Sequence, residues 1–124
     1  MKKITSLFIL LFITFSMQAQ IAQVSDALSK NDAEALSAYF ANNVELEMDE
    51  KEGMYGKSQA TIMVRDFFAK IKPATFTQKH KSEAANSKFI IGNLSSKGQT
   101  WRVTVYFRKE GSSDLIHSFK IEKE

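Results

Sequence analysis

The most constraining feature of the sequence is its C-terminal half, where helical periodicity stops. From Ala74 onward the sequence shows no helical period. Residues typical of turns at 86–87, 95–98 and 111–113 instead divide this half into four stretches. Such spacing predicts four strands in an antiparallel meander. In a chain of 124 residues there is room for one core only.

Strand alternation predicts which side chains share a face, because successive residues of a strand point to opposite sides. In the third stretch the apolar set is expected to face inward, and in the last stretch His117 falls into the inward set. His80, in the first stretch, belongs to a set whose polar composition does not fix a face. The sets are Trp101, Val103, Val105 and Phe107 in the third stretch; Leu115, His117, Phe119 and Ile121 in the last; and Phe76, Gln78, His80 and Ser82 in the first.

The strongest helix signal follows Gly56. Its apolar residues fall at three-and-four spacing and make one wide face, and Pro73 is expected to end the helix. The apolar face consists of Ala60, Met63, Val64, Phe67, Phe68 and Ile71.

Two shorter helices and a hairpin are expected before it. Helical spacing relates Ile21, Val24 and Leu28. Asn31, with Glu34 three residues later, is typical of a capping box that opens a second helix. The apolar stripe of that helix would be Leu36, Tyr39 and Phe40. Alternation of Val44, Leu46 and Met48 with acidic residues then predicts a half-buried strand, followed by a turn at 50–53.

Residues 1–19 are typical of a cleavable secretory signal. Lys2 and Lys3 precede an uninterrupted apolar run over 7–13, and the small residue Ala19 ends the segment. A membrane-spanning helix needs about 20 apolar residues, whereas polar residues close this run early. The chain has no cysteine, so it lacks the residue that a bacterial lipoprotein would need. We therefore expect a secreted or periplasmic product, without stable membrane insertion, that comprises residues 20–124 as a single domain.

Loss of the signal leaves 15 basic and 14 acidic residues, which removes the main compositional support for nucleic-acid binding. The charge is unevenly distributed: residues 20–52 carry −6 and residues 53–124 carry +7. Because exposed charges are screened at such distances, we interpret these segments as solvated faces.

This order of elements resembles the nuclear transport factor 2-like (cystatin-like) cone fold, and within it the small secreted bacterial family known as domain of unknown function 4783. The resemblance covers residues 20–124 and implies an α+β fold, with N-terminal helices and a third helix packed on a curved, mostly antiparallel sheet. It rests on Ala27, Leu28, Asp32, Leu36, Phe40, Gly56, Ala60, Phe67, Phe68 and the strand from Trp101 to Phe107. Such folds host enzymes and plain binding modules alike, so the fold does not decide the function.

The resemblance also implies where an enzyme would carry its acid or base, because enzymatic members place carboxylates inside the cone. The inward sets of the last two strands contain no carboxylate. Asp66, beside Arg65 and Lys70, is better explained as part of a solvated helical pair. We therefore predict no catalytic residue and a non-enzymatic domain.

Other chemistry finds little support. His80 and His117 lack cysteine and carboxylate neighbours at ligand spacing, so no metal is expected. The five glycines form no phosphate-binding fingerprint, the serines lie in no nucleophile elbow, and no cofactor is predicted. The acidic run over 45–52 lacks the pattern of a calcium loop.

The leading hypothesis is a binding domain whose cone cavity takes a small apolar ligand or a partner segment. The pocket candidates are Tyr39, Phe67, Trp101, His117 and Phe119. One alternative is an isomerase or hydrolase that uses His117 or His80 as its base. Another is an envelope interaction module that works through the acidic hairpin and the outer sheet face. That face is expected to carry Arg102, Thr104, Tyr106 and Ile116, and the resemblance implies a homodimer through it.

Overall fold

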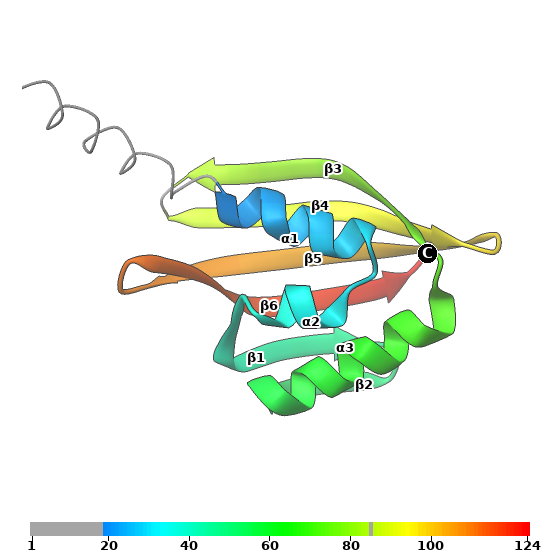
Figure 1. The fold of residues 1–124 in the computed structure, drawn as a ribbon, viewed down its shortest axis with the longest axis horizontal. Helices are drawn as coiled ribbons and strands as arrows, with labels where there is room; N and C mark the ends of the chain where they lie inside the picture. The colour runs from blue at the N-terminus through cyan, green and yellow to red at the C-terminus, as the bar shows by residue number, and fades with distance from the viewer. Residues whose placement is uncertain (1–18, 85) are drawn as a thin grey trace, which may run out of the picture.

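A computed structural model describes residues 19–84 and 86–124, and in this part of the chain it confirms the α+β class. Three helices pack on one face of a curved six-stranded sheet (Figure 1). We call the face that contacts the helices the inner face and the opposite one the outer face. The strand order is β2-β1-β6-β5-β4-β3, so β2 and β3 are edges and the sheet does not close. The elements are α1 (Ala19–Ser29), α2 (Ala33–Ser37), β1 (Phe40–Met48), β2 (Lys51–Gly56), α3 (Lys57–Ile71), β3 (Thr75–Ala84), β4 (Ser87–Ser96), β5 (Gln99–Glu110) and β6 (Ser113–Lys123).

The signal peptide expected over residues 1–19 lies outside the described residues, except for Ala19, which begins α1. No helix among the described residues has both the length and the apolar character needed to cross a membrane.

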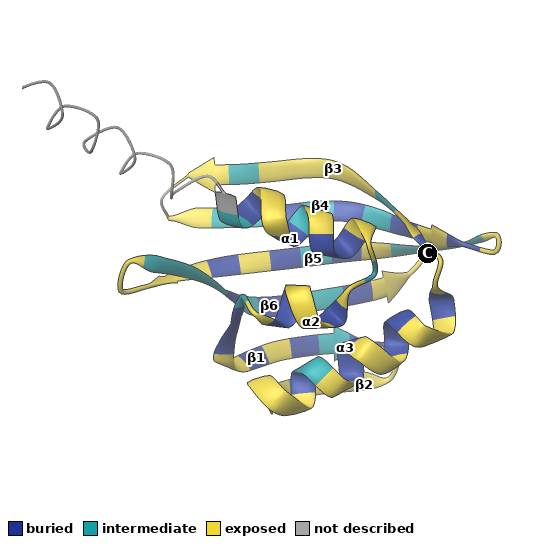
Figure 2. Ribbon diagram, in the orientation of Figure 1, coloured by how far each residue is buried: buried dark blue, intermediate teal, exposed yellow. Residues whose placement is uncertain are grey.

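The core lies between the helices and the inner face (Figure 2). On α1, Val24 and Leu28 are completely buried. On β5, Val103 and Val105 are completely buried, which confirms the inward set predicted for that strand. Burial of each such side chain stabilises the fold by about 1.5–3 kcal/mol.

Helix α3 forms where the sequence predicts it. All six residues of the predicted apolar face are buried, and the helix ends at Ile71, two residues before Pro73. The Ser96 hydroxyl of β4 donates a hydrogen bond to the Ile71 carbonyl oxygen in a buried position. The end of the helix is therefore attached directly to the sheet.

The capping box predicted at Asn31 is wrong by one residue. Asp32 is the N-cap of α2, because its Oδ1 accepts a hydrogen bond from the Ala35 N–H at 3.1 Å. Asn31 has a left-handed backbone (φ 52°), and its Nδ2 donates to the Leu28 carbonyl at the end of α1. The stripe predicted for this helix is also too long, since Tyr39 follows α2 and Phe40 begins β1.

The hairpin is confirmed as an antiparallel pair of β1 and β2. Its turn comes earlier than predicted: β2 already begins at Lys51, and Asp49 has the positive φ of the turn. On its other side β1 pairs in parallel with β6, with Leu46 opposite Phe119. This parallel pairing joins the hairpin to the four-stranded meander.

The predicted inward set of β6 is confirmed for Phe119 and Ile121, which are buried, and is wrong for Leu115 and His117 because of a β-bulge. Phe107 pairs with Ile116 and Tyr106 pairs with Ser118, so His117 is an extra residue in the ladder. Ile116 is consequently on the inner face and completely buried.

Strand β3 also contains an irregularity, and it contradicts the predicted grouping of His80 with Phe76 and Gln78. Gln78 pairs with Gly92 and His80 pairs with Ile91, so the strand gains a residue between these two positions. Phe76 and Gln78 therefore face inward, whereas His80 shares the outer face with Ile91.

Candidate functional site

The structure brings together two of the five predicted pocket residues at one end of the sheet. Phe67 of α3 and Trp101 of β5 make an edge-to-face contact, with ring centroids 5.7 Å apart and an interplanar angle of 87°. Phe119 is completely buried and packs against Phe40, with ring centroids 6.2 Å apart. Phe119 therefore belongs to the core beneath the helices.

The other two predicted residues lie at the opposite end. The Ile116 N–H donates to the Tyr39 carbonyl oxygen at 2.7 Å, which places Tyr39 beside the β6 bulge that contains His117. Trp101 pairs with Lys123, whereas Tyr106 is the residue of β5 opposite the bulge. At about 3.3 Å per residue, Trp101 and Tyr106 are roughly 17 Å apart along β5, and so are Trp101 and the bulge that contains His117. The five residues therefore do not line one pocket.

The two histidines are also separate. His80 is on β3 and His117 on β6, three strand spacings apart, which corresponds to about 14 Å. The His117 Nε2 is buried without a hydrogen-bond partner among the described residues, although Glu110 Oε1 lies 3.4 Å away. Within the described ranges, no group of three or more His, Cys, Asp or Glu side chains is arranged to hold a metal ion.

A groove of about 790 Å³ lies at the Trp101 end, between α3, the β1–β2 turn and the end of β6. We call it the α3 groove. Its buried lining residues are Met48, Met63 and Phe67, which make an apolar floor. Trp101 does not line the groove but contacts Phe67 of its floor.

The rim of the α3 groove carries three acidic and three basic side chains. They are Asp49, Glu50, Lys51, Asp66, Lys70 and Lys123. Within the described part of the chain, none of them makes an ion pair. The helical pair expected at Asp66 is absent there, and Arg65 instead binds Glu34 of α2. The rim charges are therefore available to a ligand.

Sequence reasoning found only Phe67 of this floor. Met48 and Met63 fall at strand and helix spacing that also suits a core, so nothing local marks them as groove residues. The groove arises because the β1–β2 turn approaches α3 in the folded chain, a contact between segments that alternation and helical periodicity do not encode.

The outer face of the sheet also carries apolar side chains. Tyr106 is 44% exposed and packs against Phe89, with ring centroids 6.1 Å apart. Met54, on β2, is 64% exposed. Ile116, which was expected on this face, lies on the inner face because of the β6 bulge.

Comparison with protein families adds a decisive observation, because a family model described as "Domain of unknown function (DUF4783)" matches residues 21–122. The chain belongs to the DUF4783 family. This confirms the resemblance stated from the sequence. Comparison with curated proteins gave no match.

Solved structures of DUF4783 proteins have the same fold. A protein from Bacteroides ovatus is 29% identical, with a TM-score of 0.78 over 83% of this chain and 94% of that one. A protein from Bacteroides uniformis is 27% identical, with a TM-score of 0.78 over 83% of this chain and 95% of that one. An NTF2-like protein of unknown function from Cytophaga hutchinsonii is 14% identical, with a TM-score of 0.59 over 84% of this chain and 86% of that one. This last likeness concerns the fold alone.

Proposed function

We propose that this DUF4783 chain is the precursor of an exported, non-enzymatic domain that binds a small amphiphilic ligand in the α3 groove. The observation that carries the proposal is the combination of an apolar floor with rim charges of both signs that make no ion pair among residues 19–84 and 86–124. A volume of about 790 Å³ is within the range of small-molecule sites. The leader over residues 1–19 supports a secreted or periplasmic location.

The ligand class follows from the lining. Met48, Met63 and Phe67 offer adaptable and aromatic surface for an alkyl or aryl body. Lys70 and Lys123 lie on the rim and can hold an anionic head group. The same groove would accept a segment of a partner protein that has one apolar side chain and a neighbouring charge. Such a segment is the alternative ligand.

The test uses Trp101, the single tryptophan of the chain, as a fluorescent donor. Anilinonaphthalene sulfonate, an aromatic anion, is expected to bind the mature domain and to receive excitation energy from Trp101. Short alkyl sulfonates should displace it, and each added methylene group should tighten binding about fourfold, the equivalent of about 0.8 kcal/mol per buried CH₂.

Matched variants locate the site. The double variant Lys70→Gln and Lys123→Gln should weaken alkyl sulfonate binding about tenfold, because the head group loses its charged partners. The control, Lys57→Gln with Lys109→Gln, changes two exposed lysines outside the groove lining and should bind as the parent does. A folded parent protein without energy transfer, or equal losses in both double variants, would contradict the proposal.

We also propose that a second copy of the chain covers the outer face, as the family resemblance implies. Tyr106, Phe89 and Met54 supply apolar area on that face. The acidic side chains Glu45 and Glu52 of the β1–β2 hairpin can complement Arg102 of β5 in the partner copy.

An enzymatic role for the histidines receives less support. His80 and His117 are separated across the sheet, and neither lines the α3 groove. The proposal therefore assigns no catalytic step to them.

A further inference from the structure

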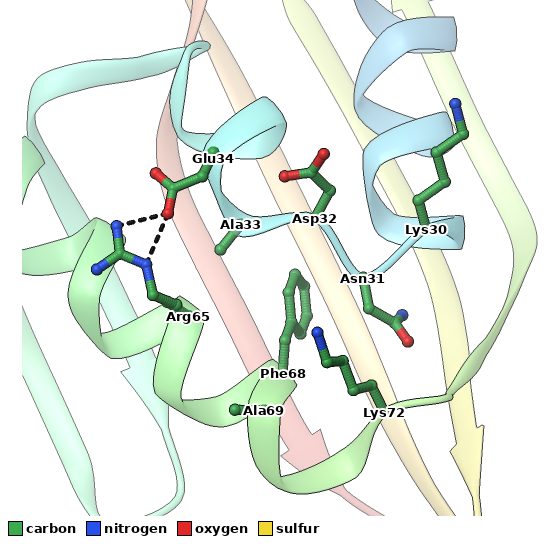
Figure 3. A pocket seen from close by; sticks show the side chains of 9 residues that line it. All are labelled: Lys30, Asn31, Asp32, Ala33, Glu34, Arg65, Phe68, Ala69 and Lys72. Atoms are coloured by element: carbon green, nitrogen blue, oxygen red, sulfur yellow. Dashed lines mark hydrogen bonds and ion pairs between the residues drawn. The ribbon is translucent and has the colours of Figure 1, made fainter.

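A second pocket lies on the other flank of α3, between this helix and the junction of α1 with α2 (Figure 3). We call it the α2–α3 pocket. Its volume is about 320 Å³, and it is lined by none of the five residues proposed from the sequence. Ala69, exposed on α3, borders both this pocket and the α3 groove.

One wall of this pocket is held in place by hydrogen bonds on several sides. The Asn31 side chain donates to the Leu28 carbonyl at 3.0 Å and accepts from the Ala74 N–H at 2.8 Å. The Asp32 Oδ1 accepts from the Ala35 N–H at 3.1 Å. The cap hydrogen bond therefore restricts the Asp32 carboxylate before any ligand arrives, which lowers the entropic cost of binding to it.

Two of the three cations that line the pocket are already paired. Arg65 Nε donates to Glu34 Oε1 at 2.6 Å, and Lys30 Nζ lies 3.0 Å from Asp26 Oδ2. The hydrogen bond to Asp26, followed by the charge of that residue, raises the pKa of Lys30 above its usual value. Both cations are therefore engaged with acidic partners within the protein.

Lys72 is the third cation, and it makes no ion pair with any described residue. Figure 3 shows its side chain extending from the end of α3 toward the Phe68 ring, with the Asp32 carboxylate on the other side of the ring in this view. Asp32 likewise makes no ion pair among the described residues. Among the described residues, the Lys72 ammonium and the Asp32 carboxylate thus line the pocket without an ion pair, although the charge of Asp32 also contributes to the raised pKa of Lys30.

We propose that the α2–α3 pocket binds a small zwitterion, namely a free α-amino acid with an aliphatic side chain. Lys72 binds its carboxylate and Asp32 binds its ammonium group. The aliphatic side chain lies against the exposed Ala69, beside the largely buried Phe68 and Ala33. The small volume favours a ligand of this size over a lipid, and the neighbouring Asp32 and Glu34 disfavour a purely anionic ligand such as phosphate.

The experiment is a nuclear magnetic resonance titration of the isotope-labelled mature domain with L-leucine. Saturable shifts are expected at the amides of Asp32 and of residues 68–72. L-leucinamide lacks the carboxylate and 4-methylpentanoate lacks the ammonium group, so each should bind about tenfold more weakly than L-leucine. Absence of saturable shifts with L-leucine, or equal binding of all three compounds, would overturn the proposal.

Conservative variants separate this pocket from the α3 groove. Asp32→Asn retains a side chain that caps helices well, and Lys72→Gln retains the length of the stem, so both should fold. Each should weaken L-leucine binding about tenfold and leave alkyl sulfonate binding in the groove unchanged. The matched groove variants Asp66→Asn and Lys70→Gln should leave L-leucine binding unchanged. If the groove variants lose L-leucine binding instead, L-leucine binds in the α3 groove, and its assignment to the α2–α3 pocket is overturned.

Discussion

Gly92 is a position where the backbone of the sheet leaves no room for a side chain. It lies on the inner face of β4, opposite Val103, and is buried. An added Cβ would lie 2.5 Å from the Thr77 carbonyl oxygen and 2.6 Å from two atoms of the Phe76 ring. The ring can move, but the carbonyl oxygen belongs to the neighbouring strand and cannot move without disturbing the pairing.

We therefore expect Gly92→Ala to lower the free energy of unfolding by about 1–3 kcal/mol, the usual cost of overpacking. Urea unfolding followed by circular dichroism measures the change. Gly56→Ala is the control, because the nearest atom to its added Cβ is the Asn42 carbonyl oxygen at 4.0 Å. Equal destabilisation by the two substitutions would contradict the close approach of β3 to Gly92.

Single residues also mark a limit of sequence interpretation. Asn31 and Asp32 both belong to the residue types that cap helices, and the sequence alone favours Asn31 because Glu34 follows it at the right distance. The structure uses Asn31 to end α1 and Asp32 to begin α2. The caps of two helices separated so closely are adjacent residues, and a local motif cannot tell which residue serves which helix end.

At the scale of elements, the β6 bulge reverses the roles of two neighbouring residues. Ile116 is completely buried on the inner face, whereas the His117 side chain is 20% exposed at the bulge. Simple alternation predicts the opposite, with His117 buried and Ile116 on the outer face. Substitutions at the two positions therefore show whether β6 is regular or bulged.

Ile116→Ala should lower the free energy of unfolding by about 2–4 kcal/mol, because it leaves a cavity in the core. His117→Ala should cost less than about 1 kcal/mol, since it removes a buried nitrogen that has no hydrogen-bond partner among the described residues. Denaturant midpoints of the two variants provide the measurement. A larger loss for His117→Ala than for Ile116→Ala would show that β6 follows the regular alternation.

The elements that the sequence predicts well are those whose burial is periodic. Helix α3 keeps one apolar face from Ala60 to Ile71, and β5 alternates without interruption from Trp101 to Phe107. Strands β3 and β6 are interrupted by an extra residue, which shifts every later side chain to the other face. Alternation carries no signal for such an insertion.

The candidate site is less predictable for a related reason. The contact of Phe67 with Trp101 follows from two inward-facing aromatic residues on correctly predicted elements. The groove itself depends on how closely the β1–β2 turn and Lys123 approach α3. These segments are distant in the sequence, so their arrangement is determined only by the complete sheet order.

At the scale of the whole molecule, the three helices cover the inner face of the sheet, and no other described element packs on the outer face. A dimer through the outer face should depend on Tyr106, so Tyr106→Arg is expected to convert it to a monomer, as measured by analytical ultracentrifugation. Ile62→Arg is the matched control, because Ile62 on α3 is similarly exposed, at 47% against 44% for Tyr106. A parent protein that sediments as a monomer, or dissociation by Ile62→Arg, would contradict this interface.

The proposed function requires that the domain carry an amphiphilic ligand in the α3 groove. The most direct measurement is native mass spectrometry of the protein purified gently from its own cells, followed by denaturing extraction. We expect a stoichiometric adduct with an apolar body and a charged head group, reduced in the Lys70→Gln and Lys123→Gln double variant. A protein that carries no adduct, or an adduct unaffected by these substitutions, would contradict the claim.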